Sequence, residues 1–207
     1  YALYGFTQDQ LAHTLMPLGD YTKPKIRELA EQLNLKMVAN KPDSQEICFV
    51  SNNDYKEFLQ ERNIKVEPGP FLDSKGNKIG THQGIAYYTI GQRKGLGIAL
   101  GKPMYVVELD VKRNAVILGE HDEVFGEELI SMNNNFITVD ELTGPMQVDA
   151  KIRYSAKASE AVITPMESGL VRVSFKAPQR AITPGQAVVF YQDDLVVGGG
   201  TILKQTK

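Results

Sequence analysis

Cys48 carries the most reactive side chain in this sequence. It is the only cysteine among 207 residues, so no disulfide can form within the chain. A thiolate can act as a nucleophile or carry sulfur, although a lone cysteine between Ile47 and Phe49 is more often a small buried hydrophobe. The neighbouring carboxylates of Asp43 and Glu46 would raise the pKa of the thiol rather than lower it. These residues alone leave a catalytic and a structural cysteine both open.

A glycine-rich run, Gly91-Gln92-Arg93-Lys94-Gly95-Leu96-Gly97, is the second candidate. Glycines let backbone N–H groups approach an anion closely, and the arginine and lysine supply positive charge. The glycine spacing misses the dinucleotide fingerprint by one place, and Gly101-Lys102-Pro103 lacks the Ser or Thr of a phosphate loop. An anion-contacting loop and a tight turn between strands both stay open.

A third candidate is the Arg-Tyr pair within Ile152-Arg153-Tyr154-Ser155. In it, a cation that can pair with phosphate stands next to a ring that can stack on a base.

The three histidines have no Cys or carboxylate at metal-ligand spacing, so no metal is predicted. They are His13, His82 and His121. A cysteine–histidine hydrolase needs its partners near only in space, and nothing in the sequence supports one.

The first fifty residues have helical patterning. One helix is expected from Thr7 to about Met16, and a second from Thr22 to about Asn34, with apolar residues along one face. Leu35 to Ala39 is expected to form a short strand. These elements are too few to close a core, so we interpret them as the tail of a larger α/β domain. Their apolar faces should be partly exposed unless a second copy of the chain covers them.

A short helix from about Asn53 to Arg62 precedes a change to strand patterning. Ser74-Lys75-Gly76-Asn77 is typical of a hairpin turn, and strands are expected at Met104–Leu109 and Ala115–Leu118, which indicates a small β-rich domain. An acidic stretch from His121 to Glu128 marks the next boundary.

Short strand-like segments separated by Gly, Pro or Asn-Asp fill the rest of the chain and predict a closed or nearly closed barrel. They are residues 136–139, 148–154, 161–164, 170–175, 187–191 and 195–202. The predicted fold class is therefore α+β and mainly β, with a helical beginning, a small central β-rich domain and a carboxy-terminal β-barrel.

Composition and net charge exclude few classes of partner. The net charge of −2 gives no general sign of a nucleic-acid partner, but acids are absent from 74–107 and from 168–192, where lysines and arginines occur. No apolar run approaches the roughly 18 residues that span a bilayer, so no membrane partner is expected. One cysteine and an ordinary soluble composition fit a reducing cytosol, and we expect a cytoplasmic protein.

Two motifs carry a resemblance to a known family. Asp43-Ser44-Gln45-Glu46-Ile47-Cys48-Phe49 resembles the second-cysteine motif of the tRNA-specific 2-thiouridylases, which place sulfur on the wobble uridine of certain tRNAs. The run from Tyr88 to Ile98 is similar to the family's glycine-rich signature, and Leu11-Ala12-His13 and Gly19-Asp20-Tyr21-Thr22-Lys23-Pro24 are also similar. The resemblance spans essentially the whole chain.

The resemblance implies a carboxy-terminal portion of a longer enzyme that is not active alone. The family's Ser-Gly-Gly-x-Asp-Ser pyrophosphatase loop and first catalytic cysteine do not occur in this sequence. By resemblance, residues 1–52 are the end of a truncated nucleotide-binding domain with the Cys48 loop, 53–125 the small central domain, and 126–207 the tRNA-binding barrel.

The resemblance also implies a chemistry. ATP, bound in the domain absent from this sequence, would adenylate the uracil carbonyl oxygen. Cys48, as catalytic residue, would carry sulfur as a persulfide delivered by a cysteine desulfurase or a relay protein. That persulfide, or sulfide released from it by the first cysteine, would attack the activated carbon and displace AMP.

Three positions match the family's tRNA contacts: Arg153, Tyr154, and Gln186 within Pro184-Gly185-Gln186. No residue of this chain is assigned to ATP or to a metal. Two alternatives remain: a non-catalytic RNA-binding module with a structural Cys48, and a protein-interaction fragment with no RNA role.

Overall fold

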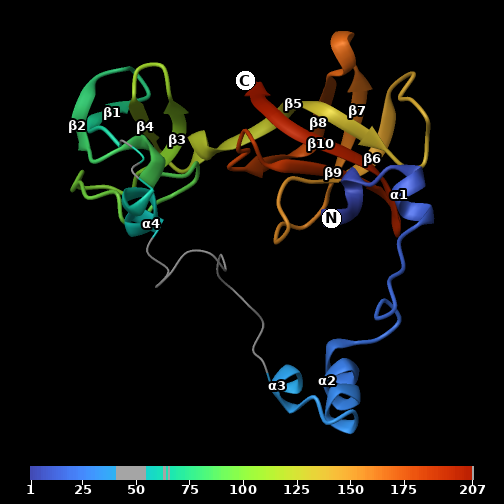
Figure 1. Ribbon diagram of the computed structural model, residues 1–207. Helices are drawn as coiled ribbons and strands as arrows, with labels where there is room; N and C mark the ends of the chain where they lie inside the picture. The colour runs from blue at the N-terminus through green and yellow to red at the C-terminus, as the bar shows by residue number, and fades with distance from the viewer. Residues whose placement is uncertain (41–54, 63, 65, 207) are drawn as a thin grey trace. The chain divides into compact units, whose positions relative to one another are not determined.

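The computed structural model describes residues 1–40, 55–62, 64 and 66–206 (Figure 1). The described chain forms two compact units. One consists of residues 1–8 with the chain from Val66 onward and contains all the described strands. The other comprises the described residues between them and is helical.

The helical unit is built around α2 (Lys23–Gln32), which follows the expected start at Thr22 and has Pro24 in its first turn. It ends in a Schellman motif, in which Asn34 adopts a φ of 59° and the Leu35 N–H donates to the Ala30 oxygen at 2.7 Å. The other helices are α1 (Gln8–Ala12), α3 (Lys36–Ala39) and α4 (Tyr55–Glu61).

The expected strand at Leu35–Ala39 is wrong, because this segment forms α3. The Schellman turn reverses the chain at Asn34, and Lys, Met and Ala are good helix formers that can restart a helix at once. The expectation of exposed apolar faces is confirmed. Leu15 is 89% exposed, Met37 90% and Leu33 69%.

The small sheet has the strand order β2-β1-β4-β3, with β1 parallel to β4 and the other pairs antiparallel. Its strands are β1 (Gly69–Asp73), β2 (Lys78–His82), β3 (Tyr105–Asp110) and β4 (Ala115–Gly119). The predicted hairpin joins β1 to β2, and the Asp73 carboxylate accepts the N–H groups of Lys75 and Asn77. The core of the sheet is formed by Phe71, Leu96, Val106, Val116 and Leu118.

His82 is a buried polar residue of this sheet, with 1% of its surface exposed. Its Nε2–H donates to the Asn114 carbonyl at 3.0 Å, and its Nδ1 accepts the Gly84 N–H at 3.0 Å. Both ring nitrogens are therefore hydrogen-bonded in the neutral form. The His82 ring also packs edge-on against the rings of Phe71 and Tyr88. Burial lowers the pKa of His82, against the smaller opposing effect of its hydrogen bond to Asn114.

Six strands close into a barrel in the order β10-β5-β8-β7-β6-β9, with β9 and β10 completing the circle (Figure 1). They are β5 (Phe125–Phe136), β6 (Met146–Lys151), β7 (Ser159–Pro165), β8 (Val171–Arg180), β9 (Ala187–Gln192) and β10 (Leu195–Thr206). Inward residues alternate with outward ones and fill the interior, among them Leu129, Ile163, Val173, Val188, Phe190 and Ile202. The predicted mainly β class with a barrel is confirmed.

The first barrel strand differs from the expectation. β5 begins at Phe125, within the acidic stretch rather than after it, and 137–139 lie beyond its end. The chain passes from the small sheet, which ends at Gly119, to the barrel between Gly119 and Phe125, so this passage overlaps the acidic stretch. Glu127 points to solvent, and the Glu128 carboxylate accepts hydrogen bonds from Ser174 and Thr206, while Leu129 is buried. Glu127 and Glu128 thus belong to β5, whereas Asp122 and Glu123 lie in the 3-10 turn that precedes it.

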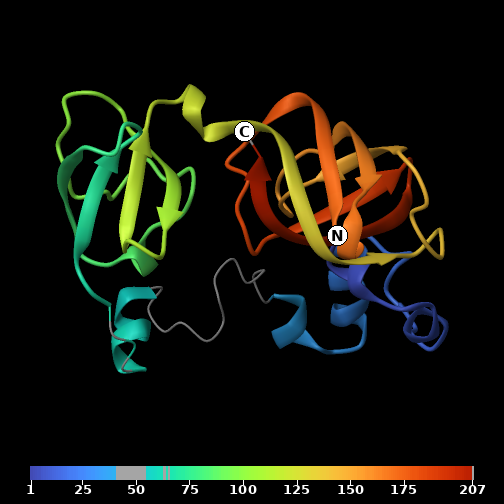
Figure 2. The same ribbon diagram turned by 90° about the horizontal axis from the view of Figure 1, so that it is seen from above.

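The amino-terminal residues lie against the barrel (Figure 2). The Asn135 side chain donates to the carbonyls of Tyr4 and Phe6 at 2.7 and 2.9 Å, and Gln8 donates to the Ile137 oxygen at 2.6 Å. These bonds fix the first residues of the chain beside β5 and β10.

Candidate functional site

Strand directions bring the predicted RNA-contacting residues to one end of the barrel. β6 and β8 each pair antiparallel with β7, so their carboxyl ends lie at the same end, and β9 begins there because it is antiparallel to β6. Arg153 and Tyr154 follow β6, Arg180 is the last residue of β8, and Gln186 directly precedes β9. We call this region the basic end; its residues are Tyr1, Lys151, Arg153, Tyr154, Arg180 and Gln186.

Arg153 is half-buried and anchored by its own guanidinium. Its Nη2 donates to the Ala181 carbonyl at 2.7 Å and to the Thr183 hydroxyl at 3.0 Å. Burial, and then the charge of Arg180, lower the pKa of Arg153, which stays charged at neutral pH because an arginine starts far above neutrality. The arrangement holds a fixed positive charge, and within the described part of the chain its remaining N–H groups have no partner and can bind an anion.

Tyr154 presents an aromatic ring to solvent, with 77% of its surface exposed. The Tyr1 ring lies edge-on to it at 6.1 Å, and the Lys151 ammonium lies 5.6 Å from the Tyr154 centroid and 5.9 Å from that of Tyr1. Tyr1 is itself held by its hydroxyl, which donates to the Ala187 carbonyl at 2.8 Å. Exposed rings with an adjacent cation are the combination that binds single-stranded RNA by stacking and charge.

Gln186 lies in the turn that leads into β9. Its N–H donates to the Thr183 carbonyl at 3.2 Å, its carbonyl accepts the Ile202 N–H at 2.8 Å, and its side chain is exposed. Gly185 permits the turn with a φ of 83°. Because Thr183 also accepts the Arg153 guanidinium, one turn positions both residues.

Arg180 joins the glycine-rich loop to the barrel. Its Nη2 donates to the Gly91 carbonyl at 3.0 Å, and its guanidinium lies 5.8 Å from the centroid of the Tyr105 ring. Gly91 has a φ of 87°, and a β-carbon there would lie 2.7 Å from that of Ala181. The start of the glycine-rich run is therefore in close contact with the basic end.

The basic end has positive charge without local compensation. The ion pairs found among the described residues involve none of Lys151, Arg153 and Arg180. Charges that lie close together without carboxylate partners attract a polyanion.

Sequence reasoning missed Tyr1, Lys151 and Arg180 as members of this site. The signal for Arg180 is its place in the acid-free stretch 168–192. Tyr1 and Lys151 have no signal beyond residue type, because their approach to Tyr154 depends on the folded chain.

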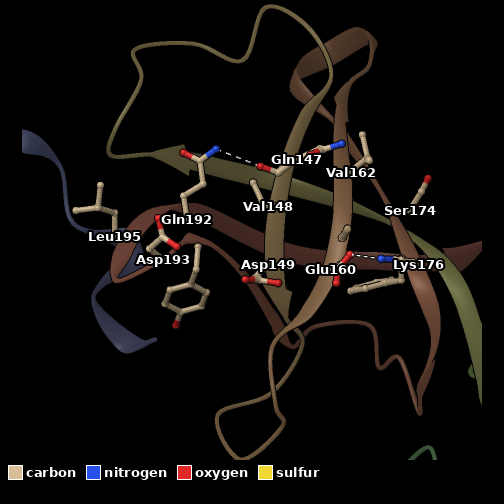
Figure 3. Close-up of a pocket in the computed structure, with 13 residues that line it drawn as sticks. Gln147, Val148, Asp149, Glu160, Val162, Ser174, Lys176, Gln192, Asp193 and Leu195 are labelled. Atoms are coloured by element: carbon tan, nitrogen blue, oxygen red, sulfur yellow. Dashed lines mark hydrogen bonds and ion pairs between the residues drawn. The ribbon is translucent and has the colours of Figure 1, made fainter.

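A concave surface lies elsewhere, on the outside of the barrel across β6 to β9 (Figure 3). The groove, of about 900 Å³, exposes the carboxylates of Asp149, Glu160 and Asp193. Lys176 also lines it, but its ammonium is paired with Glu160 at 2.6 Å. The surplus of acids disfavours a nucleic acid in this groove, so the basic end is the better RNA surface.

Cys48, the predicted sulfur carrier, lies outside the described residues. Within the described part of the chain, no cluster of three or more His, Cys, Asp or Glu side chains is arranged to hold a metal ion. The helices described here are also all too short or too polar to cross a bilayer.

Comparison with known proteins decides the family. Residues 1–52 match the family model described as tRNA methyl transferase HUP domain, 56–120 the tRNA methyl transferase PRC-barrel domain, and 127–202 the aminomethyltransferase beta-barrel domain. The chain is 60% identical over 203 residues to tRNA-specific 2-thiouridylase MnmA of Acetivibrio thermocellus. The aligned region covers 98% of this chain and 56% of that protein. The chain belongs to the tRNA-specific 2-thiouridylase family.

Other 2-thiouridylases are similarly close. Identity is 59% over 208 residues to MnmA 1 of Thermoanaerobacter pseudethanolicus, across 100% of this chain and 57% of that protein. It is 55% over 203 residues to MnmA of Clostridium perfringens, across 98% of this chain and 56% of that protein. The chain thus spans little more than half the length of these relatives. The resemblance read from the Cys48 and glycine-rich motifs is confirmed at the level of the family.

Proposed function

We propose that this chain supplies the tRNA-binding barrel and the sulfur-carrying cysteine of an enzyme that thiolates carbon 2 of the wobble uridine in tRNA. Its high identity along the whole chain to proteins named tRNA-specific 2-thiouridylase supports the activity. One observation in the structure supports the RNA role: the Tyr154 ring is exposed beside the Lys151 ammonium, at the end of the barrel where Ala181 and Thr183 anchor the Arg153 guanidinium.

The basic end suits tRNA because its residues offer three kinds of contact: a fixed charge, a stacking surface and a hydrogen-bonding amide. Arg153 is fixed by Ala181 and Thr183, so its charge is in place before a phosphate arrives and little side-chain entropy is lost on binding. The Tyr154 ring offers a stacking surface that accepts any base. Gln186 adds an amide on the same turn that can donate to or accept from a base edge or a sugar.

Sulfur transfer in this proposal falls to Cys48. After ATP has converted the carbonyl oxygen into a leaving group, the outer sulfur of the Cys48 persulfide bonds to carbon 2 and AMP departs. The thiolate of a second cysteine then attacks the Cys48 sulfur and breaks the S–S bond to release the thiolated uridine. In the alternative order, the second cysteine attacks the Cys48 sulfur first and releases sulfide, which then bonds to carbon 2 as AMP departs. The two cysteines are left as a disulfide, so a reductant must restore the thiols before the next cycle. We assign the ATP step and the second cysteine to residues outside this sequence, which the longer relatives have room to supply.

The decisive experiment measures the intact mass of the full-length protein after incubation with a cysteine desulfurase and cysteine. We expect a gain of one sulfur atom that dithiothreitol removes and that a Cys48→Ser variant does not show. The same variant should lose thiolation of a tRNA transcript with a wobble uridine while keeping tRNA affinity within about twofold, because the barrel is unchanged.

Each readout has an outcome against the proposal. Thiolation by Cys48→Ser would remove the cysteine from the sulfur path. Tight tRNA binding by a protein that gains no sulfur and thiolates nothing would identify a non-catalytic RNA-binding module. No tRNA binding by the unmodified protein would refute the RNA role of the basic end.

A further inference from the structure

We propose that Arg180 is a further RNA-contacting residue, which binds one backbone phosphate of the tRNA together with Arg153. The inference rests on the proposed function, since it extends the RNA surface of the same barrel. Arg180 ends β8 and Arg153 follows β6, and the strand directions place both at the basic end.

Both guanidinium groups have N–H donors without a partner among the described residues. A guanidinium carries five N–H groups. Within the described ranges of the chain, the Nη2 of Arg153 donates to Ala181 and Thr183 while its Nε and Nη1 groups have no partner, and Arg180 donates only from its Nη2, to the Gly91 carbonyl. Guanidinium groups with donors to spare are suited to bidentate binding of phosphate oxygens.

The two arginines lie close together. Arg153 bonds the carbonyl of Ala181, the residue next to Arg180 in the chain, and the charge of Arg180 opposes that of Arg153. The described ion pairs include neither residue. A phosphate between them would add two attractions that offset this repulsion.

The backbone between the two groups is in an unfavourable conformation for its residue. Ala181 is fully buried and has a φ of 58°, although it is not glycine. Its N–H donates to the Val124 carbonyl at 2.8 Å, which holds it in place. Such positions are concentrated at binding sites, where the surrounding structure imposes them. Here the conformation orients the Ala181 carbonyl, which accepts the Arg153 guanidinium.

The neighbours of the pair favour RNA over an acidic protein segment. Tyr154 is exposed beside Lys151, so a ring and three cations share one end of the barrel. A peptide carboxylate has no use for a stacking surface of this kind, whereas a nucleotide supplies a phosphate and a base together.

The test compares tRNA affinity across a series of KCl concentrations, with full-length protein and an unmodified tRNA transcript that has uridine at the wobble position. We expect Arg180→Gln to weaken binding about tenfold at low salt. The slope of log affinity against log salt should fall by about one, because one fewer phosphate is neutralised. Arg180→Lys should keep the slope, since it keeps the charge.

The matched control is Arg172→Gln, an exposed arginine on the same strand near its opposite end. It makes the same change of charge and should leave both affinity and slope unchanged. Tyr154→Ala, run in the same series, reports on the proposed function independently.

The outcomes separate the two proposals. If Tyr154→Ala weakens binding but Arg180→Gln matches the unmodified protein, the Arg180 contact is wrong and the proposed function stands. If Arg180→Gln and Arg180→Lys lose affinity equally with no change of slope, Arg180 acts only by holding the Gly91 loop. If the unmodified protein does not bind this tRNA, the proposed function itself is refuted.

Discussion

Gly91→Ala should open the contact between the glycine-rich loop and the barrel. At a φ of 87°, the left-handed backbone conformation of an alanine costs about 1–2 kcal/mol of stability. Its β-carbon would also lie 2.7 Å from that of Ala181, well inside ordinary contact. Ala181 is buried and hydrogen-bonded to Val124, so it cannot move aside easily. Overpacking of this kind costs about 1–3 kcal/mol, for a total of about 2–5 kcal/mol.

Gly97→Ala supplies the matched control within the same loop. Gly97 has a φ of 72°, but a β-carbon there meets nothing within 4 Å. It should therefore cost only the backbone part, about 1–2 kcal/mol. The difference between the two variants measures the contact with Ala181.

Hydrogen exchange read by mass spectrometry is the assay, because the loop can open without unfolding the barrel. The informative amides are those of Gly91, which donates to Val106 at 2.7 Å, and of Val106, which donates to Gln92 at 2.9 Å. Their opening free energy should fall in both variants and further in Gly91→Ala. Equal falls would show that the loop does not contact Ala181, and the link to Arg180 would then fail with it.

Two predictions concern stability. Between about pH 6.5 and 5, the free energy of unfolding of the small sheet should fall by at most about 1.4 kcal/mol per pH unit, because His82 is buried neutral and takes up its proton on unfolding. Exchange of residues 69–119 measured across this range checks it, and His82→Gln should flatten the dependence. Phe190→Ala, in the barrel core against Phe136, should cost about 3–5 kcal/mol in urea unfolding. The exposed Leu195→Ala should stay within about 0.5 kcal/mol, and equal costs would contradict the assigned core.

The barrel could be anticipated because its strands alternate. Residues 171–175 place Val171, Val173 and Phe175 inward, and the same two-residue period recurs in the other strands. Strand ends were harder to predict. β8 and β10 continue as far as Arg180 and Thr206 through polar residues, where pairing with a neighbour rather than hydrophobicity maintains the strand.

The two errors share a cause. The patterning predicts the first barrel strand only at 136–139, yet β5 begins at Phe125, and the Glu128 carboxylate is hydrogen-bonded by Ser174 and Thr206 from the strands on either side of it. Leu35–Ala39 suggests a strand, yet the Schellman turn at Asn34 reverses the chain and a new helix follows. In both places the deciding contacts come from chain that a short sequence window does not include.

The positions of the charged residues in the candidate site also could not be predicted from short stretches of sequence. A net charge of −2 gives no sign of an RNA partner, because it is a sum over surfaces with opposite signs. The outer groove carries Asp149, Glu160 and Asp193, while the basic end gathers Lys151, Arg153 and Arg180. Which strand ends meet depends on the pairing order β8-β7-β6-β9, and no local pattern encodes that order. Arg180 enters the site only because β7 lies between β8 and β6, so a polyanion would encounter a surface far more positive than the composition implies.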